Sequence, residues 1–95
     1  MKEKPNLLQW VTESMALPGE PIPGQPLVEI TGYNRVLIEN HCGIREYHSE
    51  KIGIAVKFGC IEVCGCNLEL SQMTKEQLII SGQIHTVALQ RRNAQ

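Results

Sequence analysis

Three of the four cysteines lie close together and offer the most obvious chemistry of the chain. They are Cys60, Cys64 and Cys66, and His41 with Cys42 supplies two further soft donors. Structural zinc sites usually take CxxC pairs from a tight turn, which is not the spacing found here. On one straight strand Cys60 and Cys64 would stand about 13 Å apart, too far for two thiolates on one metal. We therefore interpret these cysteines as small half-buried side chains. A thiol-rich zinc or redox module built from Cys60, Cys64 and Cys66 is the alternative.

Nucleophilic catalysis is the second chemistry that the residue types allow. Cys42 stands next to His41, but neighbours on a strand point to opposite faces, so the imidazole would not reach the thiol unless a turn redirected it. His48 and His85 are the other candidate bases, and the chain has no Asp to orient any of them. A disulfide of Cys64 with Cys66, or of Cys42 with a neighbour, would need an oxidising compartment. The residues by themselves reveal no reaction, and we expect no catalytic residue.

Size and charge exclude several other classes of protein. The chain has 95 residues and a net charge of −1, which suits one domain and gives no electrostatic footprint for nucleic acid. No apolar run reaches the roughly 18 residues of a membrane span, and no signal-peptide block follows the N-terminus. We expect a cytoplasmic protein with reduced thiols. The basic pair Arg91-Arg92 is interpreted as part of a solvated tail.

The N-terminal quarter predicts one short amphipathic helix. Asn6 can cap it, and Pro18 stops it just after Leu17. Residues 18–26 contain four prolines and form an extended linker. A helix of about ten residues is marginal alone, so its apolar stripe must dock, either on the sheet or on a partner. The stripe, which is the candidate partner-docking face, consists of Leu7, Leu8, Val11 and Met15.

From Leu27 onward the apolar pattern changes to a period of two, with turn residues between short runs. The expected strands are a run from Leu27 ended by Gly32, then Arg35–Asn40, Ile44–His48, Lys51–Phe58, a pair within Phe58–Leu70 bent at Gly59 and Gly65, Leu78–Ser81 ended by Gly82, and Ile84–Leu89. The fold class is therefore all-β. We predict a small antiparallel β-sandwich, immunoglobulin-like or barrel-like, of about six to eight short strands. The predicted divisions are 1–26 for helix and linker, 27–90 for the β domain and 91–95 for the tail.

Alternation also predicts which side chains face the core. Phe58 is expected on the inner face with Ile52, Ile54 and Val56, and Phe58-Gly59 is expected to turn the chain. The next inner residues are Ile61, Val63, Leu68 and Leu70. The segment Asn40-His41-Cys42-Gly43 is expected to form a turn.

Several of these stretches, in this order, carry a resemblance to a known family. They are Ser14-Met15-Ala16-Leu17-Pro18, Pro26-Leu27-Val28-Glu29-Ile30-Thr31-Gly32, Ile38-Glu39-Asn40-His41-Cys42-Gly43-Ile44, Gly59-Cys60-Ile61-Glu62-Val63-Cys64-Gly65 and Leu78-Ile79-Ile80-Ser81-Gly82-Gln83-Ile84. Over nearly the whole chain this pattern resembles the YabP/YqfC family of sporulation proteins, in particular its YqfC branch.

The resemblance implies a mother-cell protein of an endospore-forming bacterium with a role in spore-envelope formation. It implies no enzymatic activity, no cofactor and no metal. Members of the YqfC branch typically go with a membrane protein, YqfD, so a YqfD-like protein is one expected partner, with a place at the forespore membrane. The small body of short strands, the lack of a catalytic set and the detachable helix lead us to expect protein–protein contacts, with a homodimer through an exposed strand edge as one assembly. The family's recurrent turn residues correspond to Asn40, Gly43, Gly59, Gly65 and Gly82, and relatives usually carry polar residues where the three clustered cysteines stand.

Overall fold

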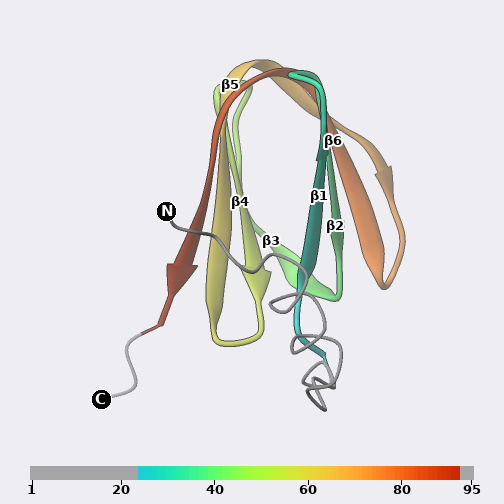
Figure 1. The fold of residues 1–95 in the computed structure, drawn as a ribbon, viewed down its shortest axis with the longest axis vertical. Helices are drawn as coiled ribbons and strands as arrows, with labels where there is room; N and C mark the ends of the chain where they lie inside the picture. Colours follow the sequence, from blue (N-terminus) through green and yellow to red (C-terminus); the bar gives the residue numbers. More distant parts are fainter. Residues whose placement is uncertain (1–23, 93–95) are drawn as a thin grey trace, which may run out of the picture.

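The structure, a computed structural model, describes residues 24–92 and shows that part of the chain to be all-β (Figure 1). Its strands are β1 (Leu27–Thr31), β2 (Arg35–Glu39), β3 (His41–Tyr47), β4 (Lys51–Val56), β5 (Gly59–Met73) and β6 (Gln77–Arg91). They form one antiparallel sheet in the order β1-β2-β6-β5-β4-β3. The all-β antiparallel prediction is confirmed. The predicted N-terminal helix lies outside the described residues.

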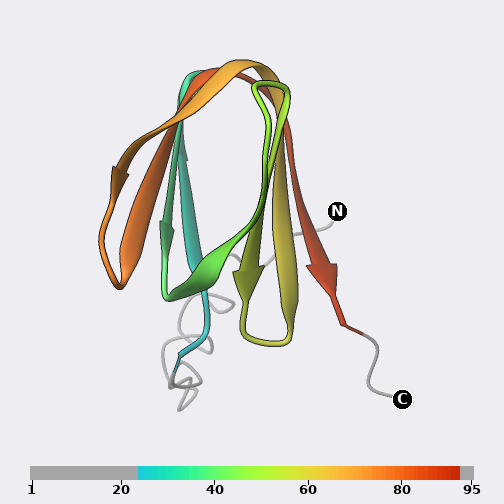
Figure 2. The ribbon, with the colours of Figure 1, turned by 180° about the vertical axis from the view of Figure 1, so that it is seen from behind.

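The single sheet bends over on itself, so that it supplies two layers. β2 pairs with β6 only over Gln77–Ser81, whereas β4 pairs with β5 only over Gly59–Cys64. The first layer therefore contains β1, β2 and the first part of β6, and the second contains β3, β4 and the first part of β5. The long strands β5 and β6 arch from one layer to the other (Figure 1). Seen from behind, β3 crosses diagonally from the end of β2 to β4 (Figure 2).

The arch is made at glycines in the middle of β5 and β6. The register between these strands shifts after Cys64 and again after Cys66, and such bulges bend a strand. At Gly65 an added Cβ would collide with the Gln83 carbonyl oxygen, and Gly82 has a φ of 138°. The prediction that Gly82 ends a strand was therefore wrong, because it bends one strand of 15 residues. The predicted strand pair within Phe58–Leu70 is likewise part of the single strand β5.

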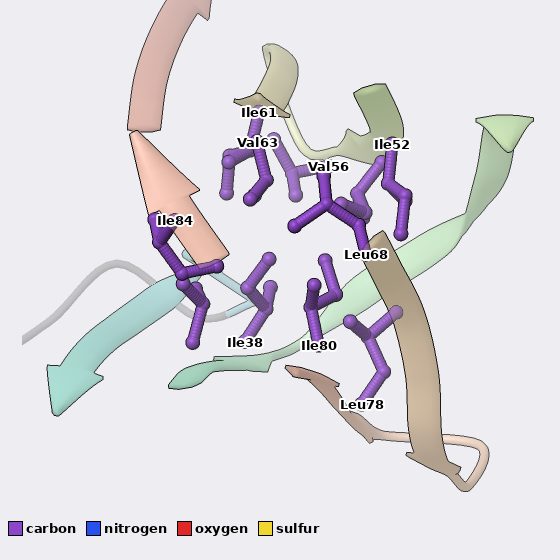
Figure 3. Close-up of a cluster of buried hydrophobic side chains, with 11 residues drawn as sticks. Ile38, Ile52, Val56, Ile61, Val63, Leu68, Leu78, Ile80 and Ile84 are labelled. Carbon is purple, nitrogen blue, oxygen red and sulfur yellow. The ribbon is translucent and has the colours of Figure 1, made fainter. Parts of the chain in front are cut away.

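The core lies between the two layers and is built from aliphatic side chains. Its buried members are Val36, Ile38, Ile52, Ile54, Val56, Ile61, Val63, Leu68, Leu78, Ile80 and Ile84. Figure 3 shows Ile61 and Val63 of one layer pointing toward Ile38 and Ile80 of the other. The alternation predicted for β4 and β5 is confirmed over these positions, and Leu70 packs against the core while remaining partly exposed.

Two local predictions about turns were wrong in part. The chain does turn at Phe58, whose φ is 71°, but the Phe58 side chain does not join the inner face of β4 and is 54% exposed. His41 and Cys42 lie in β3, so the turn is shorter than the predicted four residues. It is made at Asn40, whose φ is 64° and whose backbone N–H donates to the Glu76 carbonyl oxygen at 2.7 Å.

Candidate interaction surface

The clustered cysteines are spread along β5 and do not converge. Each pairs with a different residue of β6: Cys60 with Gln90, Cys64 with Thr86 and Cys66 with Gln83. Cys60 is buried, and its thiol donates to Gln90 Oε1 at 3.8 Å. Within residues 24–92, no group of three or more His, Cys, Asp or Glu side chains is arranged to hold a metal ion. The described geometry therefore gives no support to the alternative zinc module.

The His41–Cys42 pair does not form a nucleophile and base. The Gly43 N–H donates to His41 Nδ1 at 3.1 Å, so that nitrogen is the acceptor and the proton of a neutral ring sits on Nε2. His41 Nε2 then donates to the Thr74 carbonyl oxygen at 2.9 Å. With both ring nitrogens held by backbone groups, the imidazole links the start of β3 to the β5–β6 turn. Cys42 is exposed and lies on the next residue of the same strand.

The expected turn residues lie where the backbone is constrained. Asn40 and Gly43 have positive φ angles, and the Asn40 amide donates to the Gln25 carbonyl oxygen at 2.9 Å. Gly59 and Gly65 lie in β5 where the backbone of β6 approaches too closely for a Cβ. These positions shape the sheet and hold no reactive group. The predicted docking face Leu7, Leu8, Val11 and Met15 lies outside the described residues.

An open hollow on the outer side of the second layer collects basic side chains, and we call it the basic hollow. It has a volume of about 740 Å³ and is lined by Arg45 of β3, Lys57 of the β4–β5 turn, and Arg91 and Arg92 at the end of β6. Three of the four arginines of the chain thus meet at one place. No carboxylate is among the residues of the 24–92 segment that line it.

Two carboxylates of the second layer, Glu46 and Glu62, have cationic partners of their own. The Glu46 carboxylate lies 3.4 Å from His48 Nε2 and 3.8 Å from the Lys51 ammonium, which is also 3.6 Å from Glu62. Within the described part of the chain, Arg45 and Arg91 have no carboxylate within ion-pairing distance. Guanidinium groups that lack such a partner are suited to bind carboxylate or phosphate groups of another molecule.

Sequence reasoning missed the basic hollow. Arg91 was interpreted with Arg92 as part of a solvated tail, but β6 continues to Arg91, and the Arg92 N–H donates to the Phe58 carbonyl oxygen at 2.7 Å. Arg45 is far away in sequence and reaches the same place because β3 and the end of β6 flank the two central strands of the second layer. No spacing in the sequence signals that arrangement.

The structure contains no helix between residues 24 and 92 that is long and apolar enough to cross a membrane.

Comparisons with known proteins identify the family. The model of the YabP family matches residues 24–95. The protein YqfC of Bacillus subtilis (strain 168) is 22% identical over 86 residues, which cover 90% of this chain and 92% of YqfC. No solved structure matches the chain significantly. The match to YqfC agrees with the resemblance to the YqfC branch. Because the family model spans the whole described sheet and more than half of the chain, this protein belongs to the YabP family.

Proposed function

We propose that this protein is a non-enzymatic sporulation protein that acts in the mother cell, in assembly of the spore envelope, through protein–protein contacts. Membership of the YabP family supports the link to sporulation. The observation that carries the contact mechanism is the basic hollow, an exposed concave surface with several arginines and no lining carboxylate among residues 24–92.

The basic hollow indicates what kind of partner segment it would bind. Arg45, Arg91 and Arg92 offer planar donors that fit carboxylates, and Phe58 adds an exposed ring with the Lys57 ammonium 5.5 Å from its centroid. An acidic segment with an apolar residue complements both features. We propose that such a segment belongs to a YqfD-like membrane protein, which would hold this chain at the forespore membrane.

Charge reversal tests this proposal against a matched control. The tagged full-length protein is used to capture partners from detergent-solubilised membranes of sporulating cells. We expect the double variant Arg45→Glu/Arg92→Glu to lose the captured membrane protein, because two attractive contacts become repulsive. The control is Arg35→Glu, an arginine that is also exposed and lies at the start of β2 in the other layer.

Two results would contradict the proposal. Capture of the same partner by the double variant and by the control would show that the basic hollow is not the contact surface. Binding of the unmodified protein to anionic lipid vesicles, lost in the same double variant and without any captured protein, would assign the hollow to lipid headgroups.

We also propose a homodimer through an exposed sheet edge. β3, at the far end of the strand order, has a hydrogen-bonded neighbour, β4, on one side, and edge strands of this kind can pair with a second copy. Light scattering of the pure protein should then give twice the 10.6 kDa mass of one chain. A mass of one chain at high concentration would exclude this assembly.

A further inference from the structure

One side of the core is not covered by the described residues. It lies between β1, which pairs with β2 at the edge of the described sheet, and the C-terminal part of β6, which pairs with β5. Figure 1 shows the course of both strand segments. The two strands are tied together at one end, where the Ile84 N–H donates to the Tyr33 carbonyl oxygen at 2.7 Å. At the other end, Pro26 and Leu89 line a common hollow of about 370 Å³. No ladder pairs β1 with β6 in the part of the chain that the structure describes.

Side chains at this open side point into the core and yet remain exposed. Directly paired residues of an antiparallel ladder point to the same face. Ile30 pairs with Val36, and Leu89 pairs with Ile61; both partners are fully buried. Ile30 is nevertheless 52% exposed and Leu89 is 68% exposed.

The residues next to them complete the surface. Val28 and Val87 are partly buried and pack against the core cluster from the same two strands. The open side, defined as Val28, Ile30, Val87 and Leu89, is therefore a continuation of the core that the described residues leave in contact with water. Covering aliphatic area of this kind stabilises a protein because it removes apolar surface from water.

We propose that the open side is covered by the N-terminal segment of the same chain, residues 7–17, through the stripe Leu7, Leu8, Val11 and Met15. The described chain begins at this place: Gln25 and Pro26 line the same hollow as Leu89 and Phe58, and Asn40 fixes the Gln25 carbonyl at 2.9 Å. The described chain therefore begins next to Leu89, at one end of the open side, so the segment before Gly24 is attached beside the surface that it would cover.

The length of the N-terminal segment also fits the open side. The seven-residue step from Leu17 to Gly24 is rich in proline and spans about 22 Å when extended. A helix of about ten residues is about 15 Å long, against about 17 Å for the five residues of β1. The match to YqfC spans 86 residues, at least 14 more than residues 24–95 contain, so the relative carries a counterpart of this segment.

This proposal resolves the two interpretations of the helix that the sequence left open. The stripe docks on its own sheet in the free protein, and partner binding then belongs to the basic hollow on the outer face. The occupant is an aliphatic stripe because the open side presents only aliphatic side chains.

The test uses Trp10, the only tryptophan, as a reporter of whether the segment is docked. Acrylamide quenching of Trp10 is measured in the full-length protein. We expect Trp10 to be protected relative to the denatured chain. We expect Ile30→Glu and Leu89→Glu to raise quenching toward the denatured value. Leu27→Glu is the matched control, because Leu27 is 50% exposed on the same strand but pairs with Glu39 on the outer face.

A reciprocal pair of variants addresses the segment itself. Leu8→Glu/Val11→Glu should release Trp10, whereas Gln9→Glu/Ala16→Glu adds the same charge to the opposite side of the predicted helix and should not. Circular dichroism of every variant checks that the sheet is intact.

Three results would overturn the proposal. Trp10 could be as accessible in the unmodified protein as in denaturant. Its protection could fall on dilution together with the molecular mass, which would identify a second copy as the occupant. Protection that arises only when membrane fractions of sporulating cells are added would assign the segment to a partner.

Discussion

Replacing Gly65 by alanine should destabilise the protein severely, because the arch of the sheet depends on this residue. Gly65 lies in β5 opposite Ile84, at the point where the register between β5 and β6 shifts. A Cβ at Gly65 would overlap the Gln83 carbonyl oxygen. The obstacle is backbone, so no change of rotamer can remove it.

The loss in free energy of unfolding can be worked out from the separation of the β5 and β6 backbones that the added Cβ requires. Overpacking of a well-packed site costs about 1–3 kcal/mol, and separating the strands also weakens a ladder hydrogen bond, which is worth about 1 kcal/mol. We expect Gly65→Ala to lower the free energy of unfolding by about 2–4 kcal/mol. The folded body has a total stability of only about 3–10 kcal/mol if residues 24–92 carry it.

The control is Gly53→Ala in β4. A Cβ at Gly53 meets the Glu46 Cβ at 3.5 Å, which is ordinary contact. Alanine in place of glycine within a strand should be neutral or stabilise by about 0.5–1 kcal/mol. Urea unfolding followed by circular dichroism compares the two, and we expect the Gly65→Ala midpoint to fall by about 2 M or more. Equal midpoints for both variants, whether unchanged or lowered together, would refute the close-approach argument.

Three further predictions concern the core and the thiols. Ile54→Ala should cost about 2–5 kcal/mol, whereas Leu27→Ala on the outer face should stay within about 0.5 kcal/mol in the same urea assay; similar losses would contradict the inner and outer assignment. A thiol reagent followed by peptide mapping should modify exposed Cys42 first and buried Cys60 only on unfolding, and the reverse order would be inconsistent with the burial. Metal analysis of protein purified under reducing conditions should find less than about a tenth of an equivalent of zinc, since one equivalent would restore the thiol-bound metal site.

The sequence by itself determined the fold class and most of the core. Alternation placed Ile52, Ile54, Ile61 and Val63 on the inner face, because the period of a strand is fixed by backbone geometry. It also marked Asn40 as a turn residue, because its short polar side chain tolerates a left-handed backbone.

What the sequence could not determine is how a glycine is used. Gly82 looks like the end of a strand, yet it lies inside β6, because the long β5–β6 ladder stabilises a bent strand more than a break would. Alternation also assigned the Phe58 side chain to the inner face of β4, because it cannot tell that the left-handed backbone of the turn at Phe58 redirects this side chain.

The surfaces depend most on the tertiary structure. Arg45 and Arg92 line one hollow only because β3 and the end of β6 flank the same pair of strands, and Ile30 and Leu89 border the same open side only because the sheet bends. The clustered cysteines show the converse, since they are close in sequence and yet pair with separate residues along β6. Local periodicity decides which face a side chain takes, whereas the pairing of distant strands decides which faces come together.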